Sequence, residues 1–114
     1  MTTEEQFRKA VLWAAIEDYS GLWEIVWELN TLDPEGAEKQ HIQMSKAIVR
    51  DFLNRDWVQL FWCQEPYGGV TLIAEKEIGQ VLADAASWMP PDPEAVSVRV
   101  SATDAGERMY DQLA

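Results

Sequence analysis

The first part of the chain carries apolar residues at helical spacing. Phe7, Val11 and the pair Ala14–Ala15 share one face, which predicts a helix over about residues 4–17. Thr3 and the glutamine three residues after it form a capping-box pattern at the start of this segment. The spacing therefore predicts an amphipathic first helix with a defined N-terminus.

A second helix is predicted over residues 21–32, with Ser20 as its N-cap. It is the most apolar segment of the chain, because Trp23 and Trp27 widen an aliphatic stripe that already covers one face. A helix that is apolar over so wide an arc is usually buried against more than one element. The pattern favours the domain core, and a dimer or partner surface built on the two tryptophans is the alternative.

A third helix is predicted to run without a break from Pro34 to about Arg55. Asp33 stands where an N-cap is expected, and proline is favoured at the first helical position. The residues of its inward face recur three or four apart: Ile42, Ser45, Ile48, Val49, Phe52 and Leu53.

The second half of the chain contains two segments with the composition of strands. Residues 57–63 are aromatic and β-branched, and residues 96–101 alternate strictly between apolar and polar positions. We expect these two strands to pair antiparallel. We also expect four apolar residues of the second helix to pack under them: Leu22, Ile25, Val26 and Leu29.

Two further helices and a loop complete the predicted order of elements. A short helix is expected over residues 72–84 with Thr71 as its cap. The proline-rich residues 87–93 predict an extended loop. A last helix is expected over residues 104–113, with Thr103 as its N-cap.

The composition bounds the class of protein. The 114 residues are 47% apolar, which fits a single folded domain spanning residues 1–114, and the predicted mixture of helices and strands makes its class α+β. One cysteine and one histidine exclude an internal disulfide and a multi-histidine metal centre. The longest apolar run, residues 10–16, is too short for a membrane span, and the acidic residues before it do not fit a secretory signal. We therefore expect a cytoplasmic protein with no cofactor, no metal and no membrane contact.

The order of the predicted elements resembles the winged helix-turn-helix family. Residues 52–60, FLNRDWVQL, resemble the end of a recognition helix and its turn into the first wing strand. Residues 98–108, VRVSATDAGER, are similar to the second wing strand and the helix after it. The resemblance implies three N-terminal helices, a two-stranded antiparallel wing with an inserted helix, and a C-terminal helix. It also allows a homodimer that uses the first and last helices.

A stripe of polar residues on the third helix offers a nucleic-acid hypothesis. Its members share one face and are of types that contact phosphates and purine edges: Lys39, Gln43, Lys46, Arg50 and Asn54. The alternative is the solvated face of an amphipathic helix. The formal charge of the whole chain is −11, which repels a polyanion at long range. The unbroken third helix and the acidic segment between the strands also depart from the DNA-binding pattern.

The favoured hypothesis is a binding module for a basic protein partner, of the immunity-like or antitoxin-like kind. The chain has 20 acidic and 9 basic side chains, and its carboxylates gather near the second helix and between the two strands. Complementary charge of this kind speeds association with a basic protein. The candidate residues between the strands are three acids with two aromatic anchors: Glu75, Glu77, Asp84, Trp88 and Tyr67.

Enzyme chemistry has little support in the sequence. His41 has no visible acid–nucleophile partnership, and Cys63 stands mid-strand among aromatic residues, as a small buried hydrophobe does. There is no phosphate-cradling glycine loop, nucleophile elbow or metal-ligand spacing. We predict a protein that acts by binding, with DNA regulation as the alternative function.

Overall fold

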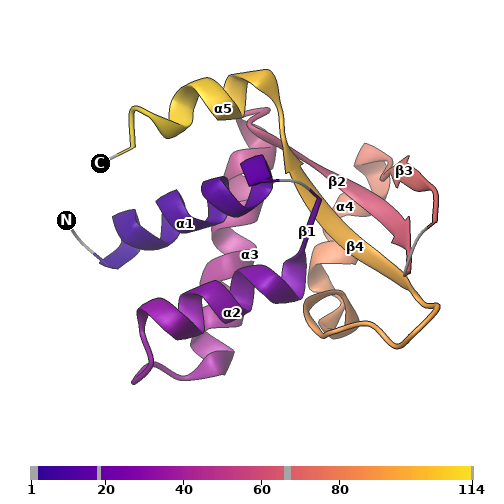
Figure 1. Cartoon of the computed structure of the whole chain (residues 1–114), viewed down its shortest axis with the longest axis horizontal. Helices are drawn as coiled ribbons and strands as arrows, with labels where there is room; N and C mark the ends of the chain where they lie inside the picture. Colours follow the sequence, from indigo (N-terminus) through magenta and orange to yellow (C-terminus); the bar gives the residue numbers. More distant parts are fainter. Residues whose placement is uncertain (1–2, 18, 66–67, 114) are drawn as a thin grey trace.

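The computed structural model describes residues 3–17, 19–65 and 68–113, which form an α+β fold with one antiparallel sheet. The helices are α1 (Thr3–Glu17), α2 (Leu22–Leu32), α3 (Glu38–Asn54), α4 (Glu75–Ala83), the 3-10 helix η1 (Ala85–Trp88) and α5 (Asp104–Tyr110). The strands are β1 (Ser20–Gly21), β2 (Val58–Gln64), β3 (Val70–Leu72) and β4 (Val96–Ala102). Figure 1 shows α1, α2 and α3 gathered beside one end of the sheet, with α4 and the loop after η1 at its other end.

The sheet confirms the central pairing and corrects the number of strands. β2 and β4 run antiparallel, with Leu60 opposite Val100 and Trp62 opposite Val98. The described residues add two short strands that the pattern did not predict, so the order is β1-β4-β2-β3 rather than a two-stranded wing. β1 and β3 have only two and three residues, too few for an alternating pattern to be recognised.

The core lies between the N-terminal helices and the inner face of the sheet. The four predicted residues of α2 are buried together with the inward residues of β2 and β4: Leu22, Ile25, Val26, Leu29, Leu60, Val98 and Val100. The prediction that α2 belongs to the core is therefore confirmed. The two tryptophans differ, because Trp23 is buried whereas Trp27 is 52% exposed.

The junction between α2 and α3 differs from the predicted helix start. Residues 34–36 form a turn, α3 begins at Glu38, and Asp33 is the C-cap of α2. The carboxylate of Asp33 instead lies 3.0 Å from Nε2 of the buried His41, whose Nδ1 lies 2.6 Å from Oδ1 of Asn30. These polar contacts between α2 and α3 hold the turn in place of the expected N-cap.

Of three other predicted helix caps, one is confirmed and two are wrong. The hydroxyl of Thr103 accepts a hydrogen bond from the N–H of Gly106 at 3.1 Å, as predicted for the start of α5. Ser20 belongs to β1, and its hydroxyl donates to the carbonyl of Ala14 at 2.6 Å rather than capping α2. Thr71 belongs to β3, so α4 begins at Glu75 without it.

Candidate functional site

A groove of about 550 Å³ lies between α4, the loop after η1 and the ends of β2 and β4. We call it the acidic groove, because three carboxylates line it alongside aromatic and aliphatic walls. Its principal lining residues are Glu77, Asp84, Asp92, Trp23, Trp62, Met89, Val96 and Val98. Concave sites with apolar walls and a few polar groups are the usual form of binding sites.

The helical period of α4 decides which of its residues reach the acidic groove. The lining residues of α4 and its C-cap recur at i, i+3, i+4 and i+7, and so share one face: Glu77, Gln80, Val81 and Asp84. Burial of Val81 and Leu82 anchors the helix to the core. Glu77 is thereby held at the rim of the groove, and Asp84 follows where the helix ends.

The three carboxylates differ in the hydrogen bonds and ion pairs that they make within the fold. Oδ1 of Asp84 accepts a hydrogen bond from the N–H of Ala86 at 3.0 Å and so caps η1. Glu77 and Asp92 are exposed and make no ion pair within the described part of the chain. The groove therefore presents negative charge without a cation of its own to compensate it.

The Trp23 wall of the groove is held by a network around Arg99. The guanidinium of Arg99 lies 5.1 Å from the ring centroid of Trp23 and donates to Oε1 of Glu65 at 3.0 Å through Nε. The hydroxyl of Ser97 donates to the same oxygen at 2.6 Å. These hydrogen bonds, from Ser97 and from Arg99, hold the pKa of the Glu65 carboxyl below its usual value. Arg99 is thus paired, and its charge does not cancel that of the groove.

The structure brings together only some of the predicted partner-binding residues. Glu77 and Asp84 line the acidic groove. Glu75 does not, because it lies in a separate hollow with Asn54 and Asp56. Tyr67 lies outside the described residues.

The expectation that Trp88 is an exposed anchor is wrong. Its side chain is 2% exposed, and its indole N–H donates to the carbonyl of Leu82 at 2.9 Å. The last two residues of η1 fall in the predicted extended loop, but they form a 3-10 turn that directs this indole into the core beneath α4. Trp88 therefore supports the groove from below and does not face a partner.

Three lining residues were not selected from the sequence as groove residues: Asp92, Trp23 and Trp62. No pattern in the sequence separates Asp92 from the other acids between the two strands, and the apolar arc of the second helix predicts that Trp23 lies in the core. Trp62 shares the inward face of β2 with Leu60, yet it is only half-buried. Its position near the end of a strand is the signal that could have indicated partial exposure.

The polar stripe of α3 is exposed along most of its length but borders different surfaces. Lys39, Gln43, Arg50 and Asn54 are exposed, and Lys46 is half-buried. Gln43, Lys46 and Arg50 line a hollow of about 410 Å³ between α3 and α4, whereas Asn54 lies in the hollow that holds Glu75. The stripe is therefore bordered by α4 and is not a uniformly open face.

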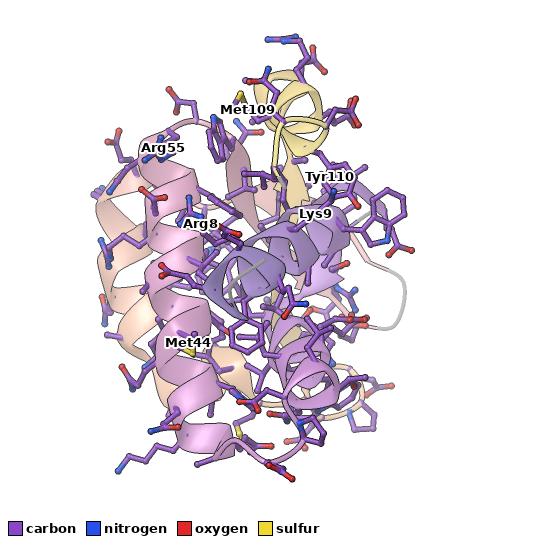
Figure 2. All side chains as sticks on the ribbon, turned by 90° about the vertical axis from the view of Figure 1, so that its left-hand side faces the viewer. Arg8, Lys9, Met44, Arg55, Met109 and Tyr110 are labelled. Atoms are coloured by element: carbon purple, nitrogen blue, oxygen red, sulfur yellow. The ribbon has the colours of Figure 1, made fainter. Side chains whose placement is uncertain are left out.

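The cations of α1 and of the C-cap of α3 are already engaged. Arg8 of α1 and Arg55 both bind Asp51, at 2.7 Å and 3.1 Å, and Figure 2 shows both side chains beside the upper end of α3. Burial acts to raise the pKa of Asp51, but the hydrogen bonds from the two arginines outweigh it and lower that pKa. Lys9 lies over the ring of Tyr110 and donates to the carbonyl of Leu113. These cations are engaged within the fold.

The residues considered for catalysis, His41 and Cys63, have the burial and contacts of residues that stabilise the fold. His41 is 1% exposed, and both of its ring nitrogens face side chains of the α2–α3 junction. Cys63 is half-buried on β2. No group of three or more histidine, cysteine, aspartate or glutamate side chains suited to holding a metal ion was found among residues 3–17, 19–65 and 68–113.

The helices of the described residues include none with the length and apolar character needed to cross a membrane. Comparisons with protein-family models, with curated proteins and with solved structures gave no match to this chain.

Proposed function

We propose that this protein is a binding module that takes a basic segment of a protein partner into the acidic groove. The proposal rests on one observation: a single concave site is lined both by three carboxylates and by tryptophan rings. The carboxylates are those of Glu77, Asp84 and Asp92. Its features match a side chain that is cationic at its tip and apolar along its stem. An immunity-like or antitoxin-like role against a basic protein fits this chemistry and the formal charge of −11.

Lysine and arginine have the form that such a groove suits. Their aliphatic stems can lie against Trp23 and Trp62 while their charged ends reach the carboxylates at the rim. An arginine can also stack on a tryptophan face. In interfaces of this kind a few apolar or aromatic contacts supply most of the affinity, while the surrounding charge sets the association rate.

A charge-neutralised variant tests the proposal with a defined probe. The groove variant combines Glu77→Gln, Asp84→Asn and Asp92→Asn, and the probe is a fluorescently labelled nona-arginine peptide, with nona-glutamate as the negative probe. Asparagine keeps the acceptor oxygen that caps η1. We expect the Kd for nona-arginine, measured by fluorescence anisotropy, to rise at least tenfold.

The matched control changes the net charge equally at a distance from the groove. It combines Glu4→Gln, Glu17→Gln and Glu107→Gln, three exposed residues on α1 and α5 that make no ion pair with the described residues. We expect this variant to change Kd less than threefold. Equal losses in the two variants would show attraction by net charge alone, and the groove proposal would be wrong.

A winged-helix DNA-binding regulator is the second candidate. It is supported by the order of elements, with three helices before β2 and β4 and one helix after them, and by the unpaired cations Lys39, Lys46 and Arg50. The net negative charge and the position of α4 beside the stripe oppose it. We expect no measurable binding to mixed-sequence duplex DNA near physiological salt.

An electrophoretic or anisotropy assay over a range of salt concentrations decides between the two candidates. A sub-micromolar complex with duplex DNA that weakens steeply with salt would reverse the ranking, because counterion release produces that dependence. Lys46→Ala and Arg50→Ala should then weaken binding and reduce the salt slope.

A further inference from the structure

The hollow between α3 and α4 lies on the other side of α4 from the acidic groove, and its lining has the opposite character. We call it the cationic hollow; its volume is about 410 Å³. It is lined by Gln43, Lys46, Ala47, Arg50, Gly79, Leu82 and Ala83. No carboxylate is among these residues, although the chain as a whole has 20 acidic side chains.

The helical period of α4 separates the two sites. At 100° per residue, Gly79, Leu82 and Ala83 occupy roughly the face opposite Glu77 and Asp84. Glu77 and Asp84 therefore point away from the hollow. Glu75 lies one turn before Gly79 on the same face and lines the neighbouring hollow with Asn54 instead. Figure 2 shows α4 beyond α3, on the side away from α1.

The two cations of the hollow are available for a ligand. Lys46 and Arg50 are one helical turn apart on α3, and neither makes an ion pair with any described residue. Arg99, by contrast, is held by Glu65, and Arg8 and Arg55 are held by Asp51. The side-chain amide of Gln43 adds a hydrogen-bond donor one turn before Lys46.

We propose that the cationic hollow binds a small organic anion, a phosphate or carboxylate group carried on a compact apolar body. The oxyanion is met by Lys46 and by the planar guanidinium of Arg50, which can donate two hydrogen bonds to it. The apolar body lies against Ala47, Leu82 and Ala83. The volume of the hollow lies within the range typical of small-molecule sites, roughly 300–1,000 Å³.

The charges favour a small anion over a polyanion. A formal charge of −11 repels a duplex through many phosphates at once, whereas a ligand with one or two charges meets chiefly the local field of the two cations. α4 also forms one wall of the hollow, which limits how closely a rigid duplex could approach the middle of α3. The proposal does not depend on the function proposed for the acidic groove.

A titration followed by ¹H–¹⁵N NMR tests the proposal on the full chain. The probes are phenyl phosphate, benzoate and inorganic phosphate, with benzylammonium as the cationic counterpart. We expect phenyl phosphate to shift the amide signals of the hollow in a saturable manner and benzylammonium to leave them unmoved. Benzoate carries a carboxylate on the same ring and should shift the same amide signals. Inorganic phosphate lacks the apolar body and should bind at least tenfold more weakly than phenyl phosphate; equal affinity would show that the apolar wall takes no part.

Matched variants locate the site. Lys46→Met combined with Arg50→Met should raise the Kd for phenyl phosphate at least tenfold. Lys39→Met combined with Arg108→Met removes the same charge from exposed positions outside the hollow and should change Kd less than twofold. Equal effects of the two pairs would overturn the proposal, as would phenyl phosphate shifts scattered over the whole surface.

A substitution on α4 tests the hollow from its other wall. A Cβ atom at Gly79 would meet nothing within 4 Å, and the position is exposed, so a side chain can be attached there without a clash at its first carbon. Gly79→Glu should abolish binding by bringing a carboxylate to the hollow, whereas Gly79→Ala should preserve it. Retained affinity in Gly79→Glu, or tight duplex binding that displaces phenyl phosphate, would show that the exposed stripe and not the hollow is the site.

Discussion

The two sides of α4 differ in both charge and construction. The acidic groove has three carboxylates and walls of large aromatic residues, whereas the cationic hollow has two free cations and small residues such as Ala47, Gly79 and Ala83. A helix of nine residues separates them. In so acidic a chain, carboxylates are expected on most surfaces. A concave surface that lacks them is therefore a stronger indication of a ligand site than one that has them.

The difference in construction has consequences for stability. The groove is built on Trp88 and Trp23, which are buried in or against the core, and on the Arg99–Glu65 pair. The hollow is formed mainly by exposed residues of two helices that are already anchored elsewhere, with Lys46 half-buried and Leu82 buried. Substitutions on the groove side should therefore change the free energy of unfolding more than those on the hollow side.

The largest expected effect is that of Trp88→Ala. Removing this 2% exposed indole leaves a cavity beneath α4 and the carbonyl of Leu82 without its donor. We expect the free energy of unfolding to fall by about 3–5 kcal/mol in urea titrations. Trp27→Ala is the control, because Trp27 is 52% exposed, and it should cost only about 1–2 kcal/mol for the half of its surface that is buried. Similar losses in both would remove the distinction between a core-supported groove and an open surface.

The next largest effect concerns Glu65, and it depends on pH. Its pKa is lowered in the folded state from 4.5, so its ionised form stabilises the fold above that pH, and this contribution is lost as pH falls through the folded pKa. Glu65→Gln should lower the free energy of unfolding by about 1.5–3 kcal/mol at neutral pH, the range for hydrogen bonds to charged groups. The difference from the unsubstituted protein should shrink as the pH falls below 4.5.

Glu77→Gln provides the matched control for this pH dependence. Glu77 is exposed at the rim and has no ion pair in the described structure, so its substitution should change stability by no more than about 0.5 kcal/mol. Urea titrations of both variants at several pH values provide the comparison. A Glu65→Gln difference that stays constant down to pH 3 would show that the network around Arg99 does not hold the groove wall.

A smaller effect is expected from Gly21→Ala on the groove side. A Cβ atom at Gly21 would fall on the ring of Trp23, which is also covered by Arg99 and has little room to move. We expect a loss of about 1–3 kcal/mol, typical of overpacking, together with a shift of the Trp23 indole signal in NMR spectra. An unchanged midpoint in urea would mean that the wall of the groove adjusts freely.

The parts of the fold that the sequence predicted are those governed by a repeating pattern. The alternation of residues 96–101 and the apolar content of residues 57–63 gave the pairing of β2 with β4, and the wide apolar arc gave the buried face of α2. Thr103 was recognisable as a cap because a single hydroxyl at a helix start has a local partner. Periodicity was the more reliable signal, because Ser20, Asp33 and Thr71 also stand where caps are expected and do not cap the predicted helices.

The parts that were missed depend on contacts that follow neither the helical nor the strand period. Nothing local indicates that Asp33 binds His41 instead of capping a helix, or that Trp88 turns inward to donate to Leu82. Glu75 and Glu77 are a different case. Side chains two positions apart in a helix point in directions about 200° apart around its axis. Helical period alone could have divided those two acids, once the start of α4 was known. The groove itself needed the tertiary structure, since its walls come from α2, β2, α4 and β4.

The smallest effect, and the sharpest contrast with Gly21, is expected at Gly79 on the hollow side. Glycine within a helix is less stable than alanine by roughly 0.5–1 kcal/mol, because it loses more backbone freedom on folding. At Gly79 an added Cβ meets nothing within 4 Å, so no steric cost offsets this gain. Gly79→Ala should therefore raise the free energy of unfolding by about 0.5–1 kcal/mol in urea titrations, opposite in sign to Gly21→Ala. A loss of stability would mean that α3 and α4 pack more closely around this position, leaving less room for an anion than the proposal requires.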